Sequence, residues 1–420
     1  MAKIEVRDLY KLFGRHGNRA YELIQSGTPL AEARARLDVV PAVVDVSFDV
    51  QEGEIFVVMG LSGSGKSSLI RCLNRLYEPS GGSIVVDGVD VTKLNHTELR
   101  QIRLEKMSMV FQHFALFPHY TVADNVGWGL EVKRVSKAEI RTRAGEALEM
   151  VGLGGWGGKY PHQLSGGMQQ RVGLARAVAT DSDIMLMDEA FSALDPLIRD
   201  DMQQQLVTIQ NELKKTIVFI THDLNEAMFL GDHIAIMKDG RIDQIGTSED
   251  ILRSPATEYV AAFVKQVDRS RVLVASAIME SPVAVFPVWE GPTAALKFMR
   301  EKQLSALHIL GPDRRLLGAV FDDDLIVAVK RGESKLESLL ETDIPRIDPE
   351  TPLSEILVDS AEYRLPLPVV QDDKLVGVLP RVALLMAIGE TATVDDGNGA
   401  EQAEAGEGEA DGRAGSGERG

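Results

Sequence analysis

The chain has 420 residues, of which 44% are hydrophobic and 26% charged, and its formal net charge is −18. This length predicts two or three domains, and the strongly negative charge argues against general nucleic-acid binding. The one cysteine, Cys72, excludes an intrachain disulfide and fits a reducing compartment. We expect neither a signal peptide nor a membrane span, because no apolar run approaches the roughly 20 residues that a span needs.

Two early stretches, residues 4–9 and 43–50, alternate apolar and polar residues as half-buried strands do. Residues 15–40 between them have helical spacing and high helix propensity, so we expect a helical insertion there. From residue 55 to about 240, short apolar runs alternate with helical patterns. Continuous apolar strands of this length predict a parallel sheet covered by helices.

The sequence GLSGSGKS at residues 60–67 has the spacing G-x-x-x-x-G-K-S and lies between an apolar strand and a helical pattern. Its backbone N–H groups are predicted to surround a β-phosphate, with Lys66 reaching the β- and γ-phosphate oxygens and the Ser67 hydroxyl binding Mg²⁺. Cys72, on the following helix, is predicted to be packed rather than reactive. The predicted nucleotide-binding residues of this loop are Gly60, Leu61, Ser62, Gly63, Ser64, Gly65, Lys66, Ser67 and Ser68.

Polar residues follow three other apolar runs. Asp188 and Glu189 end the run DIMLMDE. Gln112 ends MSMVFQ, and His222 ends TIVFITH. Because ligands gather at the carboxyl ends of strands in open α/β sheets, we expect these groups near the phosphate loop. Asp188 is predicted to hold the metal through water, and Glu189 to polarise the attacking water. Gln112 is a candidate ligand for the metal and that water. His222 is a candidate for the γ-phosphate, with a structural role as the alternative.

A second stretch, LSGGM at residues 164–168, places Ser165, Gly166 and Gly167 just ahead of a helical pattern. Helix N-termini with exposed backbone N–H groups attract phosphate. One chain therefore holds two phosphate-binding devices, separated by about a hundred residues in the sequence.

Taken together, the loop at 60–67, Gln112, LSGGM, the run ending in Asp188 and Glu189, SALD at 192–195 and His222 resemble the ATPase subunit of an ABC transporter. Their order and spacing match over roughly residues 4–250. The resemblance implies an α/β P-loop NTPase fold with a mixed sheet and a helical subdomain. It also implies ATP hydrolysis with Mg²⁺ as the metal.

The same resemblance implies that two copies pair head to tail as a homodimer. Ser165, Gly166 and Gly167 of one copy would then close the ATP held by the other copy's phosphate loop, with Asp195 at the dimer interface. Met168 stands where the family usually has Gln, a mild departure. Phe13 would stack on adenine; Tyr10 is the other candidate, and core packing is the alternative for Phe13.

After residue 265 the chain contains an internal repeat, in which residues 352–388 repeat the pattern of residues 293–329. Each unit is predicted to read helix, strand, turn, strand, helix, and the pair resembles tandem CBS domains. Nucleotide-binding CBS repeats usually end with Thr or Ser and, three residues on, an Asp that holds ribose. Here these positions are Phe321 and Asp324, then Pro380 and Ala383, which argues against adenosine. Sensing of ionic strength or of a cyclic dinucleotide and a plain dimerisation role remain alternatives.

The helical insertion, the stretches EAFSALDPLIR and THDLNEAM, and the CBS-like pair are similar to those of glycine betaine/proline betaine importers. That resemblance implies a peripheral subunit on the cytoplasmic face of the plasma membrane. Its partners would be a permease, docked beside the Gln112 loop, and a solute-binding protein. Importers of choline, carnitine or amino acids, and a soluble ABC ATPase outside transport, are the alternatives.

We therefore expect four regions. They are an ABC ATPase domain at 4–265, CBS-like repeats at 272–335 and 340–389, and a disordered acidic tail at 390–420. The tail is predicted from its Gly, Ala and acidic residues, which cannot bury enough apolar surface to fold.

Overall fold

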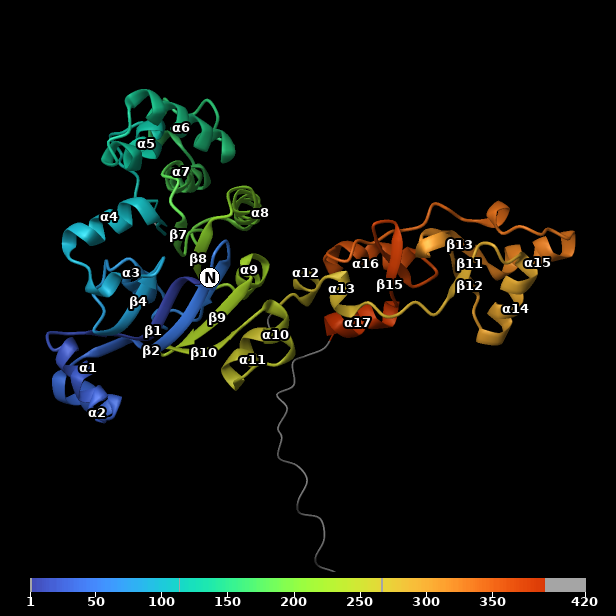
Figure 1. Cartoon of the computed structure of the whole chain (residues 1–420), viewed down its shortest axis with the longest axis horizontal. Helices are drawn as coiled ribbons and strands as arrows, with labels where there is room; N and C mark the ends of the chain where they lie inside the picture. Colours follow the sequence, from blue (N-terminus) through green and yellow to red (C-terminus); the bar gives the residue numbers. More distant parts are fainter. Residues whose placement is uncertain (1, 113, 266, 390–420) are drawn as a thin grey trace, which may run out of the picture.

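The computed structural model of the chain describes residues 2–112, 114–265 and 267–389. Figure 1 shows one large body, built from the elements up to α11 (Glu258–Val264), and an elongated body that begins near α12 (Arg269–Val272). The tail predicted at 390–420 lies outside the described residues.

The large body is organised around a six-stranded sheet with strand order β10-β9-β3-β8-β7-β6. Five strands are parallel, and only β10 runs antiparallel, to β9. The predicted mixed sheet is therefore confirmed. Every residue of β3 is buried, because side chains on both of its faces meet other layers. The strands are β3 (Ile55–Met59), β6 (Met107–Val110), β7 (Ile184–Asp188), β8 (Thr216–Thr221), β9 (His233–Lys238) and β10 (Arg241–Gly246).

A second, antiparallel sheet of order β2-β1-β4-β5 covers one face of the central sheet. The rings of Phe48 and Phe56 stack between the two sheets with centroids 4.9 Å apart. Cys72 of α3 (Lys66–Leu73) is buried in the same core, so burial raises its thiol pKa to about 12. The strands are β1 (Ala2–Phe13), β2 (Val40–Gln51), β4 (Gly81–Val86) and β5 (Val89–Asp90), with β1 and β2 longer than the stretches predicted for them.

The predicted helical insertion is present as α1 (Gly17–Gln25) and α2 (Leu30–Leu37), between β1 and β2. A small separate core of Leu12, Ala20 and Val39 holds the two helices against β1. Figure 1 shows this pair projecting from the end of the body opposite to α5 and α6.

Helices cover the other face of the central sheet and form the outlying group α5–α7 in Figure 1. The N-termini of α4 and α5 are fixed by capping boxes, Asn95 with Glu98 and Thr121 with Asp124. The helices of this face are α5 (Val122–Val132), α6 (Lys137–Met150), α7 (Gly166–Ala179), α8 (Pro196–Leu213), α9 (Leu224–Leu230), α10 (Ser248–Arg253) and α11 (Glu258–Val264). By contrast, α4 (His96–Lys106) packs its Leu99 into the core between the two sheets.

The elongated body contains two helix–strand–strand–helix units, which is the element order predicted for both repeats. In each unit the two strands pair antiparallel, and β11 (Val285–Pro287) adds a parallel strand to the first. The first unit is α14 (Pro292–Lys302), β12 (Ala306–Leu310), β13 (Leu316–Phe321) and α15 (Asp322–Arg331). The second is α16 (Leu353–Glu362), β14 (Leu367–Gln371), β15 (Lys374–Leu379) and α17 (Arg381–Gly389).

Residues 273–280, which the sequence division groups with the first repeat, have their contacts in the second unit. Ala275, in α13 (Ala275–Ile278), is buried in the core that holds Leu353 and Leu367. Isolated bridges also join Val274 to Pro352 and Glu280 to Val378. The two units are thus interleaved, since chain that precedes the first repeat completes the second.

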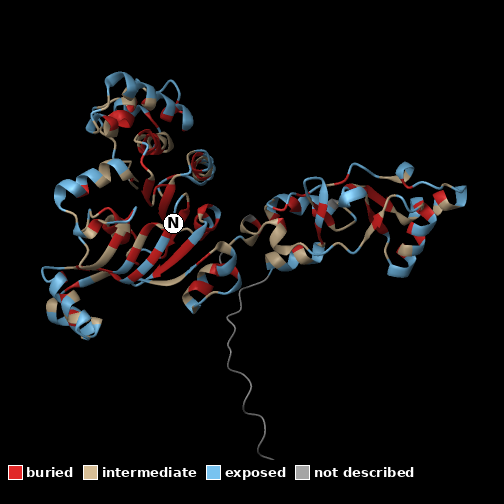
Figure 2. Ribbon diagram, viewed as in Figure 1, coloured by how far each residue is buried: buried red, intermediate tan, exposed pale blue. Residues whose placement is uncertain are grey.

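Figure 2 shows the buried residues concentrated in the strands of the central sheet and on the inward faces of the helices. Among the described residues, none of the helices combines the length and the apolar character needed to cross a membrane.

Candidate functional site

The phosphate loop connects β3 to α3, so it lies at the carboxyl end of a central strand. Gly60 and Gly65 have φ angles of 151° and 104°, which favour glycine. A Cβ at Gly65 would lie 2.0 Å from the carbonyl oxygen of Ala42, so no larger residue fits. The loop therefore keeps its backbone close-packed and presents the free N–H groups at the N-terminus of α3.

Lys66 is folded back onto the loop. Its Nζ donates to the carbonyl oxygens of Gly60 at 2.7 Å and Leu61 at 3.0 Å. The side chain is buried, which lowers the lysine pKa, while nearby Glu189 and Asp188 raise it. The Ser64 hydroxyl is also buried and has no hydrogen-bond partner among the described residues. An unpartnered buried hydroxyl beside a lysine and free N–H groups fits a phosphate.

Asp188 ends β7 and is almost wholly buried. Its Oδ2 accepts a hydrogen bond from Nη2 of Arg71 at 3.0 Å, whereas its Oδ1 is buried without a partner among the described residues. Arg71 lies on α3 one turn after Ser67 and also donates to the Tyr77 hydroxyl at 3.1 Å. An orphaned carboxylate oxygen fits the oxygen ligands of Mg²⁺ or its bound water. The sequence analysis did not single out Arg71, and no local pattern points to it.

Glu189 lies next to two other residues that were predicted at strand ends, Gln112 and His222. Gln112 Nε2 donates to Glu189 Oε2 at 3.1 Å, and His222 Nδ1 is 3.7 Å from the same oxygen. The side chain of His222 is 56% exposed and that of Glu189 18% exposed, so this cluster opens to solvent. Ser192 donates its hydroxyl to the backbone oxygen of Glu189 at 2.9 Å, a support that the sequence analysis did not anticipate.

The two aromatic candidates for adenine differ in exposure. Tyr10 is buried and contacts the ring of Tyr21 in α1. Phe13, the last residue of β1, is only partly buried, with Tyr77 edge-on at 5.3 Å and Lys11 Nζ 4.8 Å from its ring centre. The more accessible ring is therefore that of Phe13.

The second stretch predicted to bind phosphate, residues 165–167, lies elsewhere in the molecule. Ser165 caps α7, its hydroxyl accepting from the backbone N–H of Met168 at 3.3 Å. A Cβ on Gly167 would approach Ile198 of α8 to 2.7 Å, while Gly166 faces Phe114. Figure 1 shows α7 in the outlying helical group, away from α3. The structure thus brings Gln112, Glu189 and His222 together at the carboxyl ends of adjacent strands but leaves residues 165–167 outside that cluster.

Asp195 is exposed at the start of α8, where its carboxylate accepts from the backbone N–H of Ile198 at 3.1 Å. The cap fixes the SALD stretch at the N-terminus of a long helix. Asp195 therefore lies beside the cluster rather than in it.

Two family models match the chain: "ABC transporter" over residues 43–192 and "CBS domain" over residues 336–390. Among solved structures, a dimer of the ATP-binding cassette MJ0796 bound to ADP and Pi matches with a TM-score of 0.50 and 33% identity. The match covers 58% of this chain and 98% of that one. The fold is that of an ATP-binding cassette.

Curated relatives match over nearly the whole length. The glycine betaine/carnitine transport ATP-binding protein GbuA of Listeria monocytogenes is 48% identical, covering 92% of this chain and 98% of its own. The glycine betaine/proline betaine transport system ATP-binding protein ProV of Escherichia coli is 44% identical, covering 92% of this chain and 97% of its own. The chain belongs to the ABC transporter family of ATP-binding proteins, which are ATPases coupled to transport.

Proposed function

We propose that this chain is the ATPase subunit of a membrane importer for glycine betaine, proline betaine or a related quaternary ammonium solute. The observation that carries the proposal is similarity across the C-terminal repeats as well as the ATPase, to proteins named for glycine betaine transport. Other relatives are named for choline or trimethylamine N-oxide transport, at 35% and 44% identity. Those solutes are the alternatives for the cargo, which the ATPase itself need not touch.

The proposed chemistry divides the cluster into binding and reacting groups. The loop from Gly60 to Ser68 holds the phosphates of ATP, Lys66 neutralises them, and Phe13 stacks on the base. Mg²⁺, when bound, offsets charge on the phosphates; Ser67, Gln112 and Asp188 would hold it or its water. Glu189 takes the proton of the attacking water, and His222 binds the γ-phosphate.

A head-to-tail homodimer is the proposed active form. Support comes from the separation of residues 165–167 from the phosphate loop within one chain, and from the dimeric neighbour bound to ADP and Pi. Ser165, Gly166 and Gly167 of one copy would close the nucleotide held by the other, with Asp195 at the interface. Closing on ATP and opening after hydrolysis would convert binding energy into motion.

The motion requires a membrane partner. We infer a permease that docks near the Gln112 loop, a solute-binding protein in the full complex, and a peripheral position on the cytoplasmic face of the membrane. The relatives are named as parts of transport systems, which supports the permease.

The proposed division of the chain is an ATPase domain at 4–265 and CBS-like repeats at 272–335 and 340–389. Residues 273–280 pack into the core of the second repeat.

The positions that hold ribose in nucleotide-binding CBS repeats are occupied here by Asp324 and Ala383. Asp324 lies in the first turn of α15, beside Asp322 and Asp323, whereas Ala383 lies in α17. Three carboxylates there disfavour an anionic ligand such as a nucleotide phosphate. Regulation by ionic strength or a plain dimerisation role are the two functions we retain for the repeats.

Uptake of labelled glycine betaine tests the proposal. The chain is co-expressed with its permease and solute-binding protein in cells that lack betaine uptake, alongside Glu189→Gln and the control Glu212→Gln, an exposed residue of α8. We expect uptake with the wild type and the control, competition by proline betaine, and no uptake with Glu189→Gln. Uptake of labelled choline but not betaine would refute the cargo, and betaine uptake by Glu189→Gln would refute the mechanism.

A further inference from the structure

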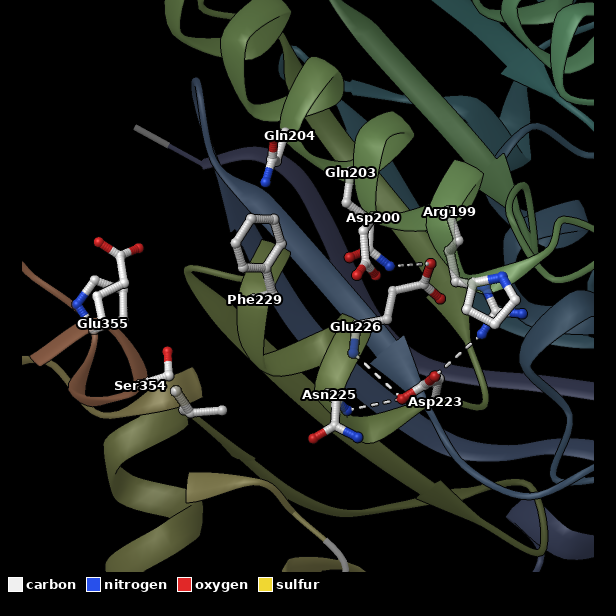
Figure 3. A pocket seen from close by; sticks show the side chains of 13 residues that line it. Arg199, Asp200, Gln203, Gln204, Asp223, Asn225, Glu226, Phe229, Ser354 and Glu355 are labelled. Carbon is white, nitrogen blue, oxygen red and sulfur yellow. Dashed lines mark hydrogen bonds and ion pairs between the residues drawn. The ribbon is translucent and has the colours of Figure 1, made fainter. Parts of the chain in front are cut away.

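Helices α8 and α9 begin immediately after two predicted site loops. Helix α8 follows Asp195, and α9 starts two residues after His222. Figure 3 shows the two helices side by side along one wall of a cavity of about 500 Å³. Val272, Pro352, Ser354 and Glu355 of the C-terminal body line the opposite wall.

One arginine of this wall joins the two loops. Arg199, in the first turn of α8, donates from Nη2 to the carbonyl oxygen of Leu194 at 3.1 Å. Its Nη1 pairs with Oδ2 of Asp223 at 3.4 Å, as the dashed line in Figure 3 shows. Leu194 precedes Asp195 directly, and Asp223 follows His222 directly. A single planar group thus spans the loop of Asp195 and the loop of His222.

Asp223 is itself fixed from several directions. Its Oδ1 accepts from the backbone N–H of Asn225 at 2.9 Å and so caps α9. Its own N–H donates to the hydroxyl of Thr221 at 2.9 Å. The residues on both sides of His222, Thr221 and Asp223, are therefore fixed by hydrogen bonds. Asp223 is also linked to α8 through its ion pair with Arg199.

We propose that Arg199 is a positioning residue for ATP hydrolysis, which couples the Asp195 loop to His222 and through it to Glu189. In the proposed dimer the Asp195 loop faces the partner copy, so this brace would connect one site to the other; this part rests on the proposed function. Among the described residues, no hydrogen bond or ion pair joins Arg199 to the phosphate loop or to Glu189. Its removal therefore misplaces reacting groups and leaves nucleotide binding intact.

The guanidinium is suited to this role because its two Nη groups reach acceptors in different directions. Lysine would keep the positive charge but present one compact donor centre, which cannot span both acceptors equally well. The Asp223→Asn variant is complementary, since asparagine still caps α9 while the ion pair with Arg199 is lost.

The test uses the chain in complex with its permease and compares Arg199→Gln, Arg199→Lys, Asp223→Asn and the double variant Arg199→Gln/Asp223→Asn. The control is Asp200→Asn, an exposed neighbour on α8. We expect kcat of Arg199→Gln and Asp223→Asn to fall about tenfold or more, KM for ATP to stay within about twofold, and Arg199→Lys to fall less. The double variant should lose no more than Arg199→Gln alone, because Arg199→Gln already removes the ion pair that Asp223→Asn breaks.

Three results would overturn the proposal: a kcat within about twofold of wild type for either single variant, losses that simply add in the double variant, or a rise in KM at constant kcat. Thermal unfolding measures how much of each variant is folded, and the rates are divided by that amount. A variant that is less stable but has a normal rate per folded complex would show a structural role only. Glu189→Gln is measured in parallel. If Glu189→Gln hydrolyses ATP normally, the proposed site assignment fails. If Glu189→Gln is inactive but the Arg199 variants hydrolyse ATP normally, only the positioning role of Arg199 fails.

Discussion

Gln112 and Glu189 follow the ends of two adjacent strands, β6 and β7, and Nε2 of Gln112 donates a hydrogen bond to Oε2 of Glu189 at 3.1 Å. His222, after β8, places its Nδ1 3.7 Å from the same carboxylate oxygen. The backbone of Glu189 has a φ angle of 45°, in the left-handed region that costs a non-glycine residue about 1 kcal/mol or more. Its two polar neighbours orient the Glu189 carboxylate, as the proposed role of general base requires.

Replacing Glu189 by glutamine should stop turnover without preventing ATP binding. The amide keeps the shape of the side chain but cannot accept a proton, and losing a general base costs about 10²–10⁴-fold in kcat. Steady-state ATP hydrolysis and equilibrium nucleotide binding measure the two properties separately. The exposed control Glu212→Gln should match wild type in both. Normal hydrolysis by Glu189→Gln would remove it as the base.

Replacing Arg71 by methionine should destabilise the protein, because Asp188 would lose its ion-pair partner while remaining buried. We expect a loss of about 2 kcal/mol in the free energy of unfolding, less than for wholly buried pairs because Arg71 is 36% exposed. Chemical denaturation measures it, with the exposed Arg100→Met on α4 as control. Added Mg²⁺ and ATP should recover part of the loss by supplying positive charge near Asp188. Equal stability of the two variants would contradict the pairing.

Glu226 should make stability depend on pH. Burial raises the pKa of Glu226 to about 7, although hydrogen bonds from Thr221 and Gln203 lower it. The charge of Asp223 raises this pKa further, and that of Arg199 lowers it. Between its ordinary value near 4.5 and about 7, the folded state binds more protons than the unfolded state, so stability falls as pH rises. Glu226→Gln removes this dependence.

Denaturation of wild type and Glu226→Gln across pH 4–8 tests this effect. The variant should match wild type near pH 4.5 and gain up to about 3 kcal/mol relative to it at pH 8. A stability difference that does not change with pH would contradict the raised pKa.

Cys72 should resist alkylation in the folded protein. Its side chain is fully buried and its thiol pKa is about 12, so little thiolate forms at pH 8. Mass spectrometry after iodoacetamide treatment, with and without denaturant, measures the difference. Rapid labelling of the native protein would show that the helix after the phosphate loop opens readily.

The sequence was most informative where function depends on local order. The phosphate loop needs glycines at fixed spacing between a strand and a helix, and the carboxyl ends of parallel strands share one edge, so Gln112, Glu189 and His222 could be predicted to meet. The helical insertion and the element order of the repeats follow from periodicity in the same way.

Contacts between distant residues that do not follow adjacent parallel strands could not be predicted. Arg71 and Asp188 are separated by 117 positions, and nothing in the helix pattern distinguishes Arg71 from other surface arginines. Arg199 acquires its partners only when α8 and α9 lie side by side. The packing of residues 273–280 into the second repeat likewise depends on tertiary burial, since short apolar segments join whichever core is open to them.

ATP turnover by complexes that contain two differently tagged copies of the chain measures most directly whether each site takes half its groups from the partner. Lys66→Ala and Ser165→Arg are placed either on the same copy, opposite a wild-type copy, or one on each copy. A shared site predicts turnover only when the two changes are on different copies, because one site then keeps both an intact lysine and an intact serine. Turnover only when both changes share one copy would contradict it and show that each chain completes its own site.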